Sequence, residues 1–328
     1  MIQTPLKFSI VTPSFNQGAF LEHTIESVIS QNVDLEYVVI DGGSSDQSID
    51  VIKRYAPRLH YWCSEVDAGQ YAAINKGFSK TSGEIMGWLN SSDLYFNWTL
   101  PTVLKIFTLF PEVKWITSLQ KICLDESGAI DGIQRVRGFG AKTFFQGRHG
   151  GPQNQNFIQQ EATFWRRSLW DQVGAKIPEE SRFAADFHLW GKFFQLEKLY
   201  GLDCPLAGFR VHGLARSASE SYQSEVDSLL KEWEAMNWIG NAPQGFCKIT
   251  KHWDKMPNGL KEGFWKIEKI HGDELLKLPE QAENIILNIC YKLYCSIVQY
   301  WYGIEGIFYF IIRLILWPIR KKSPYKYQ

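Results

Sequence analysis

Strand-like and helix-like patterns alternate through the first 120 residues, and this alternation constrains the fold more than any other feature of the chain. Short apolar runs occupy 8–12, 37–40, 59–63, 85–89 and 113–117. Segments with apolar residues at helical spacing separate them, at 21–29, 49–55, 70–78 and 98–110. Because parallel strands need a crossover connection, this order predicts an α/β fold with a mostly parallel sheet and helices on both faces.

Acidic residues follow several of these apolar runs. Asp41 comes directly after the second run, Asp67 follows the third, and Asp93 closes the turn after the fourth. Ligands of open α/β sheets bind at the carboxyl ends of the strands. Acidic side chains there can hold a hard divalent cation, which can neutralise a diphosphate. We therefore expect the functional site at this edge of the sheet.

Composition excludes several classes of protein. The 35 basic and 35 acidic residues give a formal net charge of +0, which argues against a nucleic-acid partner. The six cysteines form no CxxC pair, so we expect a reduced, cytoplasmic compartment. The sequence has neither the GxGxxG fingerprint of dinucleotide-binding proteins nor a P-loop. A nicotinamide-dependent oxidoreductase is therefore disfavoured.

The rest of the chain divides into four further segments. Residues 138–160 are rich in Gly, Asn and Gln, and 213–224 in Ser and small residues; both are expected to be loops. Helices are expected at 164–173 and 187–196. We expect one domain over 1–225, with a nucleotide-binding half to about 120 and an acceptor half from 121, then a helical linker over 226–284.

The segment 285–328 is expected to be an apolar, aromatic helical tail. Lys292, Glu305 and Arg313 interrupt it, and charges near a bilayer centre are costly, so a clean membrane span is disfavoured. An interfacial or re-entrant helix pair fits better, held at the inner face of the cytoplasmic membrane by the basic residues 320–322. A homo-oligomer interface or a core helix is the alternative.

Several segments resemble, in their order and spacing, the inverting glycosyltransferases of family 2, which have the Rossmann-like GT-A fold. The resemblance covers about residues 6–220 and rests on 12–16, 38–46, 67–77, 90–93, 160–167, 184–190 and 209–213. It implies transfer of a sugar from a nucleotide-diphosphate donor, with UDP as the expected nucleotide. The implied acceptor is a saccharide or lipid-linked saccharide, and the implied setting is bacterial surface-polysaccharide assembly.

The resemblance also implies which residues hold the donor. Thr12 and Pro13 belong to the first loop, which embraces the nucleotide. Asp41 is expected to hydrogen-bond the base or ribose, although Asp-Gly-Gly is also a common turn. Asp67 is expected near the ribose or diphosphate. Lys76 lies in the same resembling segment, and the alternative for it is a solvated helix residue.

A divalent cation, Mn²⁺ or Mg²⁺, is implied as the cofactor. Asp93 matches its acidic ligand, and Ser92 stands where the family often has a second acid. One carboxylate with diphosphate oxygens and water can satisfy such an ion; otherwise Asp93 caps the following helix. His212 is expected to approach the metal or diphosphate, and Arg216 to add positive charge over the leaving group.

Asp186 is the expected catalytic base, because the family's usual Glu-Asp motif is matched here by Ala185 and Asp186. The alternative is an ordinary helix N-cap. Glu161 is expected to orient sugar hydroxyls, together with Gln160. The departures at Ser92 and Ala185 leave open a non-catalytic nucleotide-sugar-binding or scaffold protein. A sugar nucleotidyltransferase is disfavoured, since the first loop lacks the Gly-rich, Arg-containing pattern.

Overall fold

The computed structural model describes residues 6–149, 157–178, 180–212, 220–255 and 261–270. All of them fall within the first of two compact units, 1–280. The second unit, 281–328, lies outside the described residues, and so does the tail expected at 285–328. Within the described ranges, no helix has both the length and the apolar character needed to cross a membrane.

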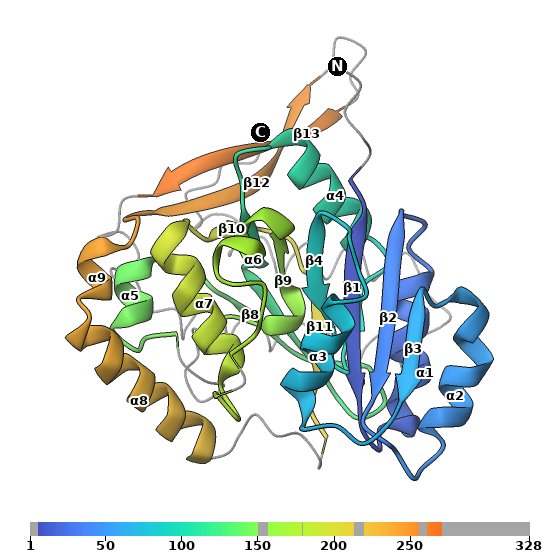
Figure 1. Cartoon of the computed structure of the whole chain (residues 1–328). Coiled ribbons are helices and arrows are strands. Elements are labelled where there is room, and N and C mark those ends of the chain that lie inside the picture. Colours follow the sequence, from blue (N-terminus) through green and yellow to red (C-terminus); the bar gives the residue numbers. More distant parts are fainter. Residues whose placement is uncertain (1–5, 150–156, 179, 213–219, 256–260, 271–328) are drawn as a thin grey trace. The chain divides into compact units, whose positions relative to one another are not determined.

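A nine-stranded sheet forms the centre of the first unit (Figure 1). Its order is β13-β12-β10-β6-β9-β4-β1-β2-β3. The bounds are β1 Phe8–Ser14, β2 Leu35–Asp41, β3 Tyr61–Ser64, β4 Ile85–Trp88, β6 Trp115–Ser118, β9 Thr163–Arg166, β10 Tyr200–Leu202, β12 Phe246–Lys255 and β13 Lys261–Ile270. Only β9 and β13 among these strands pair antiparallel with their neighbours. The predicted mostly parallel sheet is confirmed.

Helices cover both faces of this sheet. Their bounds are α1 Gly18–Ile29, α2 Ser48–Tyr55, α3 Gln70–Phe78, α4 Thr99–Leu109, α5 Ala141–Phe145, α6 Arg167–Gln172, α7 Ala185–Leu196, α8 Glu220–Ala235 and α9 Trp238–Asn241, with 3-10 turns η1 Ala56–Arg58 and η2 Gln160–Ala162. Alternate strand residues face opposite cores. Ile10 packs in the cluster that includes residues of α1 and α4, whereas Val11 packs in the cluster with α3 and α7.

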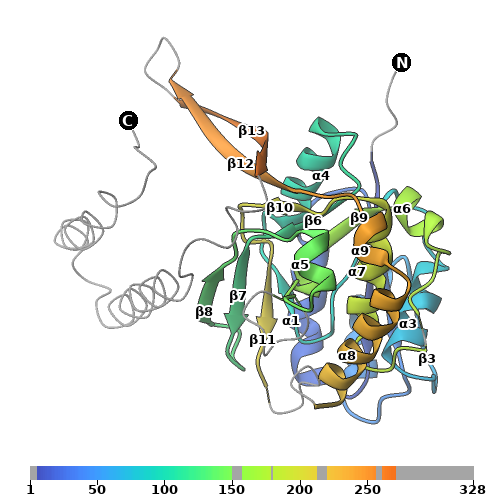
Figure 2. The same ribbon diagram turned by 90° about the vertical axis from the view of Figure 1, so that its left-hand side faces the viewer.

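A second, four-stranded sheet has the order β5-β11-β7-β8 (Figure 2). Its strands are β5 Leu94–Tyr95, β7 Gln120–Leu124, β8 Ile130–Arg135 and β11 Ala207–Arg210. β5 begins directly after Asp93 and pairs antiparallel with β11. This pairing brings β11 beside the turn that follows β4.

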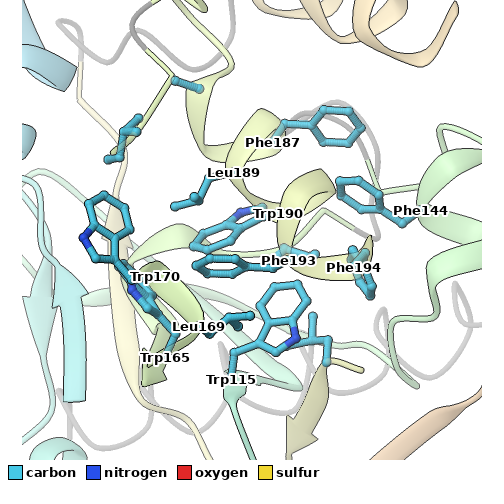
Figure 3. Close-up of a cluster of buried hydrophobic side chains, with 14 of the residues drawn as sticks. Trp115, Phe144, Trp165, Leu169, Trp170, Phe187, Leu189, Trp190, Phe193 and Phe194 are labelled. Carbon is cyan, nitrogen blue, oxygen red and sulfur yellow. The ribbon is translucent and has the colours of Figure 1, made fainter. Parts of the chain in front are cut away.

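A cluster of aromatic side chains holds α7 on the sheet (Figure 3). The ring of Trp190 stacks on Trp88 with centroids 5.8 Å apart and on Trp115 at 5.7 Å. Phe193 meets Trp115 edge-on at 5.3 Å. Aromatic burial of this kind dominates core energetics. The position of α7, and of Asp186 in its first turn, is therefore set by rigid packing against β4 and β6.

The helix expected over 164–173 is wrong in its first part. Residues Thr163–Arg166 form β9, and α6 begins only at Arg167. Trp165 is paired with Met86 of β4 on one side and with Trp115 of β6 on the other. The backbone hydrogen bonds of two flanking strands and complete burial decide the conformation here, because tertiary context overrides local pattern.

The expected helical linker over 226–284 is also corrected. α8 crosses residue 225, and two strands follow in that range: β12 joins the large sheet beside β10, and β13 pairs with β12. Phe246 and Ile249 of β12 are buried, so the strand is part of the core. In the expected loop 138–160, α5 forms and buries Phe144; residues 150–156 lie outside the described part.

Candidate active site at the carboxyl edge of the sheet

The carboxyl group of Asp41 is fully engaged within the chain. It accepts hydrogen bonds from Ser44 N at 2.9 Å, Ser44 Oγ at 2.6 Å, Gly43 N at 3.1 Å and Ser64 Oγ at 2.7 Å. A carboxylate offers about four acceptor positions, so this turn saturates it. The contact of Asp41 with a base or ribose stays a prediction, and it would have to replace one of these bonds.

The loop after β1 is fastened to the turn after β2. Asn16 has a left-handed φ of 51°; its N–H donates to Ser44 Oγ at 2.7 Å, and its Oδ1 accepts from Ser45 N at 2.9 Å. Further along, Gly18 N donates to Asp46 Oδ2 at 2.9 Å. These bonds give the first loop a fixed shape at the strand ends, where we expect the nucleotide.

The side chain of Thr12 lies inside the protein rather than at this edge. It is fully buried, and its Oγ1 is 2.9 Å from Tyr37 Oη. Pro13 is buried as well. Ser14, which the sequence reasoning did not single out, ends β1 opposite Asp41, and its buried Oγ has no hydrogen-bond partner among the described residues. Within this loop, Ser14 is better placed than Thr12 to receive a ligand.

Asp67 lies in the turn before α3, and Lys76 lies in the last turn of that helix. Asp67 Oδ1 accepts from Gly69 N at 2.8 Å. Its carboxyl also lies against Gly42, where an added Cβ would stand 3.2 Å from Oδ2, so the turns after β2 and β3 touch. Lys76 forms an ion pair with Glu65, which raises the pKa of the lysine.

Asp93 is buried in the turn between β4 and β5. Its Oδ1 accepts from the backbone N–H of Arg210 at 3.0 Å, and its Oδ2 accepts from Asn90 Nδ2 at 3.3 Å. Burial raises the pKa of this carboxyl. The N-cap of α4 is Trp98 and has no side-chain cap bond, so helix capping does not explain Asp93.

Arg210 is a component of this site that the sequence reasoning missed. The side chain is almost fully buried; Nε donates to Ser92 O at 2.8 Å, and Nη1 donates to Glu126 O at 2.7 Å. Its guanidinium lies 5.0 Å over the ring of Phe20. The only signal in the sequence is an arginine inside a strand-like run. Arg210 fixes the turn that carries Ser92 and Asp93.

Three side-chain amides join the segments around Asp93. Gln70 Nε2, at the start of α3, donates to Asn90 Oδ1 at 2.7 Å. Asn90 Nδ2 lies 3.2 Å from Gln160 Oε1, and Gln160 Nε2 donates to Trp88 O at 2.6 Å. Because β9 runs antiparallel, its beginning lies at the edge where β4 ends. This arrangement brings Gln160 and the adjacent Glu161 to the candidate site.

Glu161 is buried, and its Oε1 has no hydrogen-bond partner among the described residues. Burial raises the pKa of its carboxyl well above the ordinary value, and the negative charges of Asp93 and Asp186 raise it further. Lys121 acts in the opposite direction. Acidic groups from two distant segments therefore act on Glu161 at this edge.

Asp186 lies in the first turn of α7. Its Oδ1 accepts from Phe187 N at 2.8 Å and from Tyr222 Oη at 3.2 Å. Burial raises the pKa of Asp186 to about 6. The N-cap position belongs to Ala184, so the alternative of an ordinary N-cap is wrong. A half-buried carboxyl with a pKa of about 6 suits a group that accepts a proton near pH 7.

The residues around Asp93 fit a divalent cation as one part of its ligand set. The described ranges contain no group of three His, Cys, Asp or Glu side chains placed to hold a metal. Mg²⁺ is commonly bound by one or two carboxylates together with substrate phosphates, and Asp93 can supply one. The ring of His212 contacts Phe20, with centroids 4.8 Å apart. Arg216 lies outside the described residues.

Comparison with known proteins adds to this geometry. The family model "Glycosyl transferase family 2" matches residues 9–113. An uncharacterized glycosyltransferase of Mycobacterium tuberculosis (strain H37Rv) is 30% identical over 171 residues, which is 51% of this chain and 61% of that protein. A PGL/p-HBAD biosynthesis glycosyltransferase of Mycobacterium bovis is 35% identical over 90 residues, covering 26% of this chain and 35% of that protein.

Among solved structures, S. aureus TarS in complex with UDP-GlcNAc matches with a TM-score of 0.56 and 17% identity, over 72% of this chain and 67% of that chain. At this identity the likeness concerns the fold. The alignment spans only 61% of the length of the M. tuberculosis relative, and the family model covers the segment from β1 to the residues before β6. Residues 9–113 are thus similar to glycosyl transferase family 2, and the described residues have the GT-A α/β fold.

Proposed function

We propose that this chain is an inverting glycosyltransferase that moves a sugar from a nucleoside-diphosphate donor to a hydroxyl of a saccharide or lipid-linked saccharide. The observation that carries the proposal is that Asp93 and Asp186 lie near enough to Glu161, at the carboxyl edge of the sheet, for their charges to raise its pKa. UDP is the first nucleotide to test, since UDP-GlcNAc is the ligand named for the TarS structure.

The reaction assigns the proton to Asp186. The acceptor oxygen attacks the anomeric carbon from the side opposite the diphosphate, and a new C–O bond forms. The bond between the anomeric carbon and the diphosphate oxygen breaks, and its electron pair leaves with the diphosphate. The hydroxyl proton passes to the Asp186 carboxylate, which is mostly ionised at neutral pH because its pKa is about 6. A single displacement inverts the configuration.

The diphosphate lies on the Asp93 side in this proposal. A bound Mn²⁺ or Mg²⁺ would supply positive charge to the leaving group, and Asp93 would be its protein ligand. Arg210 holds Asp93 in place through its backbone N–H. We also propose that His212 and Arg216 approach the diphosphate, while Lys76 contributes only if it leaves Glu65.

Glu161 is proposed to bind a hydroxyl of the donor sugar. Its pKa is raised well above the ordinary value by burial, which favours the protonated form, and a protonated carboxyl can donate a hydrogen bond. Its Oε1 is buried without a hydrogen-bond partner among the described residues, and the charges of Asp93 and Asp186 act on this carboxyl. Position 185 is alanine, so it offers no carboxyl. Glu161 would then be the carboxyl that recognises a sugar hydroxyl.

The experiment that tests this function compares wild type with Asp186→Asn. Thermal unfolding is measured with UDP, GDP, dTDP and CMP, each with and without Mn²⁺, and transfer is then assayed with the sugar donors of the stabilising nucleotide. At 100 times its Kd, a nucleotide stabilises by about 2.7 kcal/mol. The variant should keep this stabilisation and lose about 10²- to 10⁴-fold in turnover. Equal turnover would remove Asp186 from its role.

A non-catalytic nucleotide-sugar-binding protein is the second candidate, favoured by Ser92 and Ala185 in place of acids. It predicts nucleotide stabilisation in wild type and in Asp186→Asn with no transfer by either. Hydrolysis or transfer of the donor sugar by wild type alone would exclude it.

The setting proposed is cell-surface glycan synthesis at the inner face of the cytoplasmic membrane. One support is the relative from M. bovis, whose name includes PGL/p-HBAD biosynthesis. The other is the apolar sequence of 285–319. Flotation with liposomes of anionic lipid tests the membrane part: the full chain should float, and a chain ending at Glu283 should not. Equal behaviour of the two would overturn it.

A further inference from the structure

Helix α8 lies outside the matched family segment, yet two of its side chains reach the beginning of α7. Both views show α8 running beside α7 (Figures 1 and 2). Tyr222 and Glu225 are three residues apart, so they share one face of α8. Their partners are the carboxyl of Asp186 and the backbone that precedes it.

Glu225 holds the backbone that leads into α7, and among the N–H groups of the helix start it reaches that of the N-cap residue Ala184. The first N–H groups of a helix have no partner within it, and Ala184 at the N-cap position has no side-chain oxygen to offer. Glu225 accepts from Phe183 N and Ala184 N at 2.7 Å each and from Arg182 N at 2.5 Å. A carboxylate is also favoured near a helix N-terminus by the helix dipole.

The turn before α7 is held from a second side by α3. Tyr71 Oη donates to Phe183 O at 2.8 Å. Asn75 donates to Ile177 O at 3.0 Å and accepts from Ile177 N at 2.7 Å. The segment that leads into Asp186 is therefore fastened between α3 and α8.

Tyr222 holds one oxygen of Asp186. Its hydroxyl donates to Oδ1, which also accepts from Phe187 N. Neither bond involves Oδ2, so Oδ2 is the oxygen left for a substrate proton. Burial and the nearby Asp186 raise the pKa of Tyr222 well above its ordinary value, so the phenol remains a donor at every pH where the enzyme works.

Packing fixes the separation of the two helices. Trp233 of α8 is buried and stacks on Phe187 of α7, with centroids 5.5 Å apart, and on Trp238 at 5.1 Å. Gly191 of α7 makes room for it: a Cβ there would stand 2.4 Å from Trp233 Cη2. The hydrogen bond between Tyr222 and Asp186 is therefore held by a rigid helix pair and not by a loop.

We propose that α8 completes the active site, with Tyr222 as a positioning residue that aims the Asp186 carboxylate and Glu225 as the group that fixes the helix start beneath it. The proposal rests on the proposed role of Asp186. The charged group that acts on Asp186 is Glu225 on α8, which opposes its ionisation. Asp186 in turn raises the pKa of Glu161 in η2. The Tyr222 hydroxyl favours the ionised form.

The test uses Tyr222→Phe in the full chain. Loss of the hydroxyl should lower kcat about 10-fold, leave KM for the donor within about 2-fold, and move the acidic limb of the kcat/KM profile up by about half to one pH unit. Tyr55→Phe is the matched control, because the Tyr55 hydroxyl bonds Glu26 and Glu22 on the surface. It should leave all three quantities unchanged. An unmoved acidic limb in Tyr222→Phe would overturn the proposal.

Two measurements need no turnover and separate this proposal from the function itself. The Asp186 carboxyl, followed by ¹³C NMR across pH, should titrate at a higher pH in Tyr222→Phe than in wild type. In Glu225→Gln, the amides of Phe183 and Ala184 should exchange hydrogen about 10-fold faster. If both changes occur and wild type transfers no sugar, the positioning of Asp186 by Tyr222 and Glu225 stands and the proposed glycosyltransferase role is wrong. If either change is absent, the role proposed for that residue is wrong.

Discussion

The backbone N–H of Arg210 donates to Asp93 Oδ1 at 3.0 Å, and its side-chain Nε donates to the carbonyl oxygen of Ser92, the residue before Asp93, at 2.8 Å. One residue at the end of β11 thus holds both the carboxyl and the backbone of the turn after β4. The turn and the strand are far apart in sequence, so the geometry of the acidic group depends on the second sheet.

Arg210→Lys should be strongly destabilising although it keeps the charge. Lysine lacks the planar fork that reaches Ser92 O and Glu126 O together. Each hydrogen bond of a charged group contributes about 1.5–3 kcal/mol, so we expect the free energy of unfolding in urea to fall by about that amount or more. Arg54→Lys, at an exposed ion pair with Glu22, should change it by less than about 0.5 kcal/mol. Equal effects of the two variants on the free energy of unfolding would contradict this role of Arg210.

Glu161→Gln should stabilise the protein at high pH. The folded-state pKa of Glu161 is raised, so as pH rises past the unfolded-state value, the unfolded chain loses a proton that the folded chain keeps. Stability therefore falls with rising pH until the folded-state pKa is reached. Glutamine removes this loss.

The melting temperature of Glu161→Gln, measured from pH 4 to pH 8, checks this. The gain over wild type should be largest at pH 8 and shrink toward pH 4. Glu232→Gln, at an exposed position of α8, serves as the control and should track wild type. A gain that does not vary with pH would mean that packing, not ionisation, causes it.

The rate of transfer should rise with pH through about pH 6. Asp186 must be ionised to accept the proton, and its pKa is about 6. Below that value kcat/KM should fall by about 10-fold per pH unit. Initial rates at saturating Mn²⁺ from pH 4.5 to pH 8 give the profile. A flat profile between pH 5 and pH 8 would assign the proton to another group.

Removal of the divalent cation should abolish nucleotide binding through Asp93. EDTA, or Asp93→Asn, is expected to remove most of the thermal stabilisation that the diphosphate gives with Mn²⁺, because the diphosphate then loses its counter-charge. Nucleoside without phosphate should be unaffected by EDTA. Full stabilisation in EDTA would place the neutralising charge on side chains such as His212 or Arg216 instead.

The sequence predicts the first half of the fold well because its strands and helices follow local patterns. The apolar runs before Asp41 and Asp93 become β2 and β4, and the helix beginning near Asp186 becomes α7. Apolar periodicity and turn residues are sufficient for such elements. The carboxyl edge where the candidate residues meet follows from the parallel order of the strands.

What the sequence does not predict depends on contacts between distant segments. β9 is a strand because β4 and β6 flank it, and Arg210 belongs to the site because β11 pairs beside β5. The hydroxyl of Thr12 lies in the core against Tyr37, a direction that a loop motif does not specify. Tyr222 falls in the range 213–224 that is expected to be a loop, and it reaches Asp186 because residues from Glu220 onward form α8.

The antiparallel β9 has a consequence for how the chain is made. β4 leaves the ribosome well before residues 163–166, and until they arrive its outer edge has no strand beside it. An unpaired edge next to the buried residues of β4 is a site for association with other nascent chains. A fragment ending near residue 113 keeps this edge open permanently. Such a fragment should therefore aggregate during expression. In chains that extend past β9, this strand pairs with the open edge of β4.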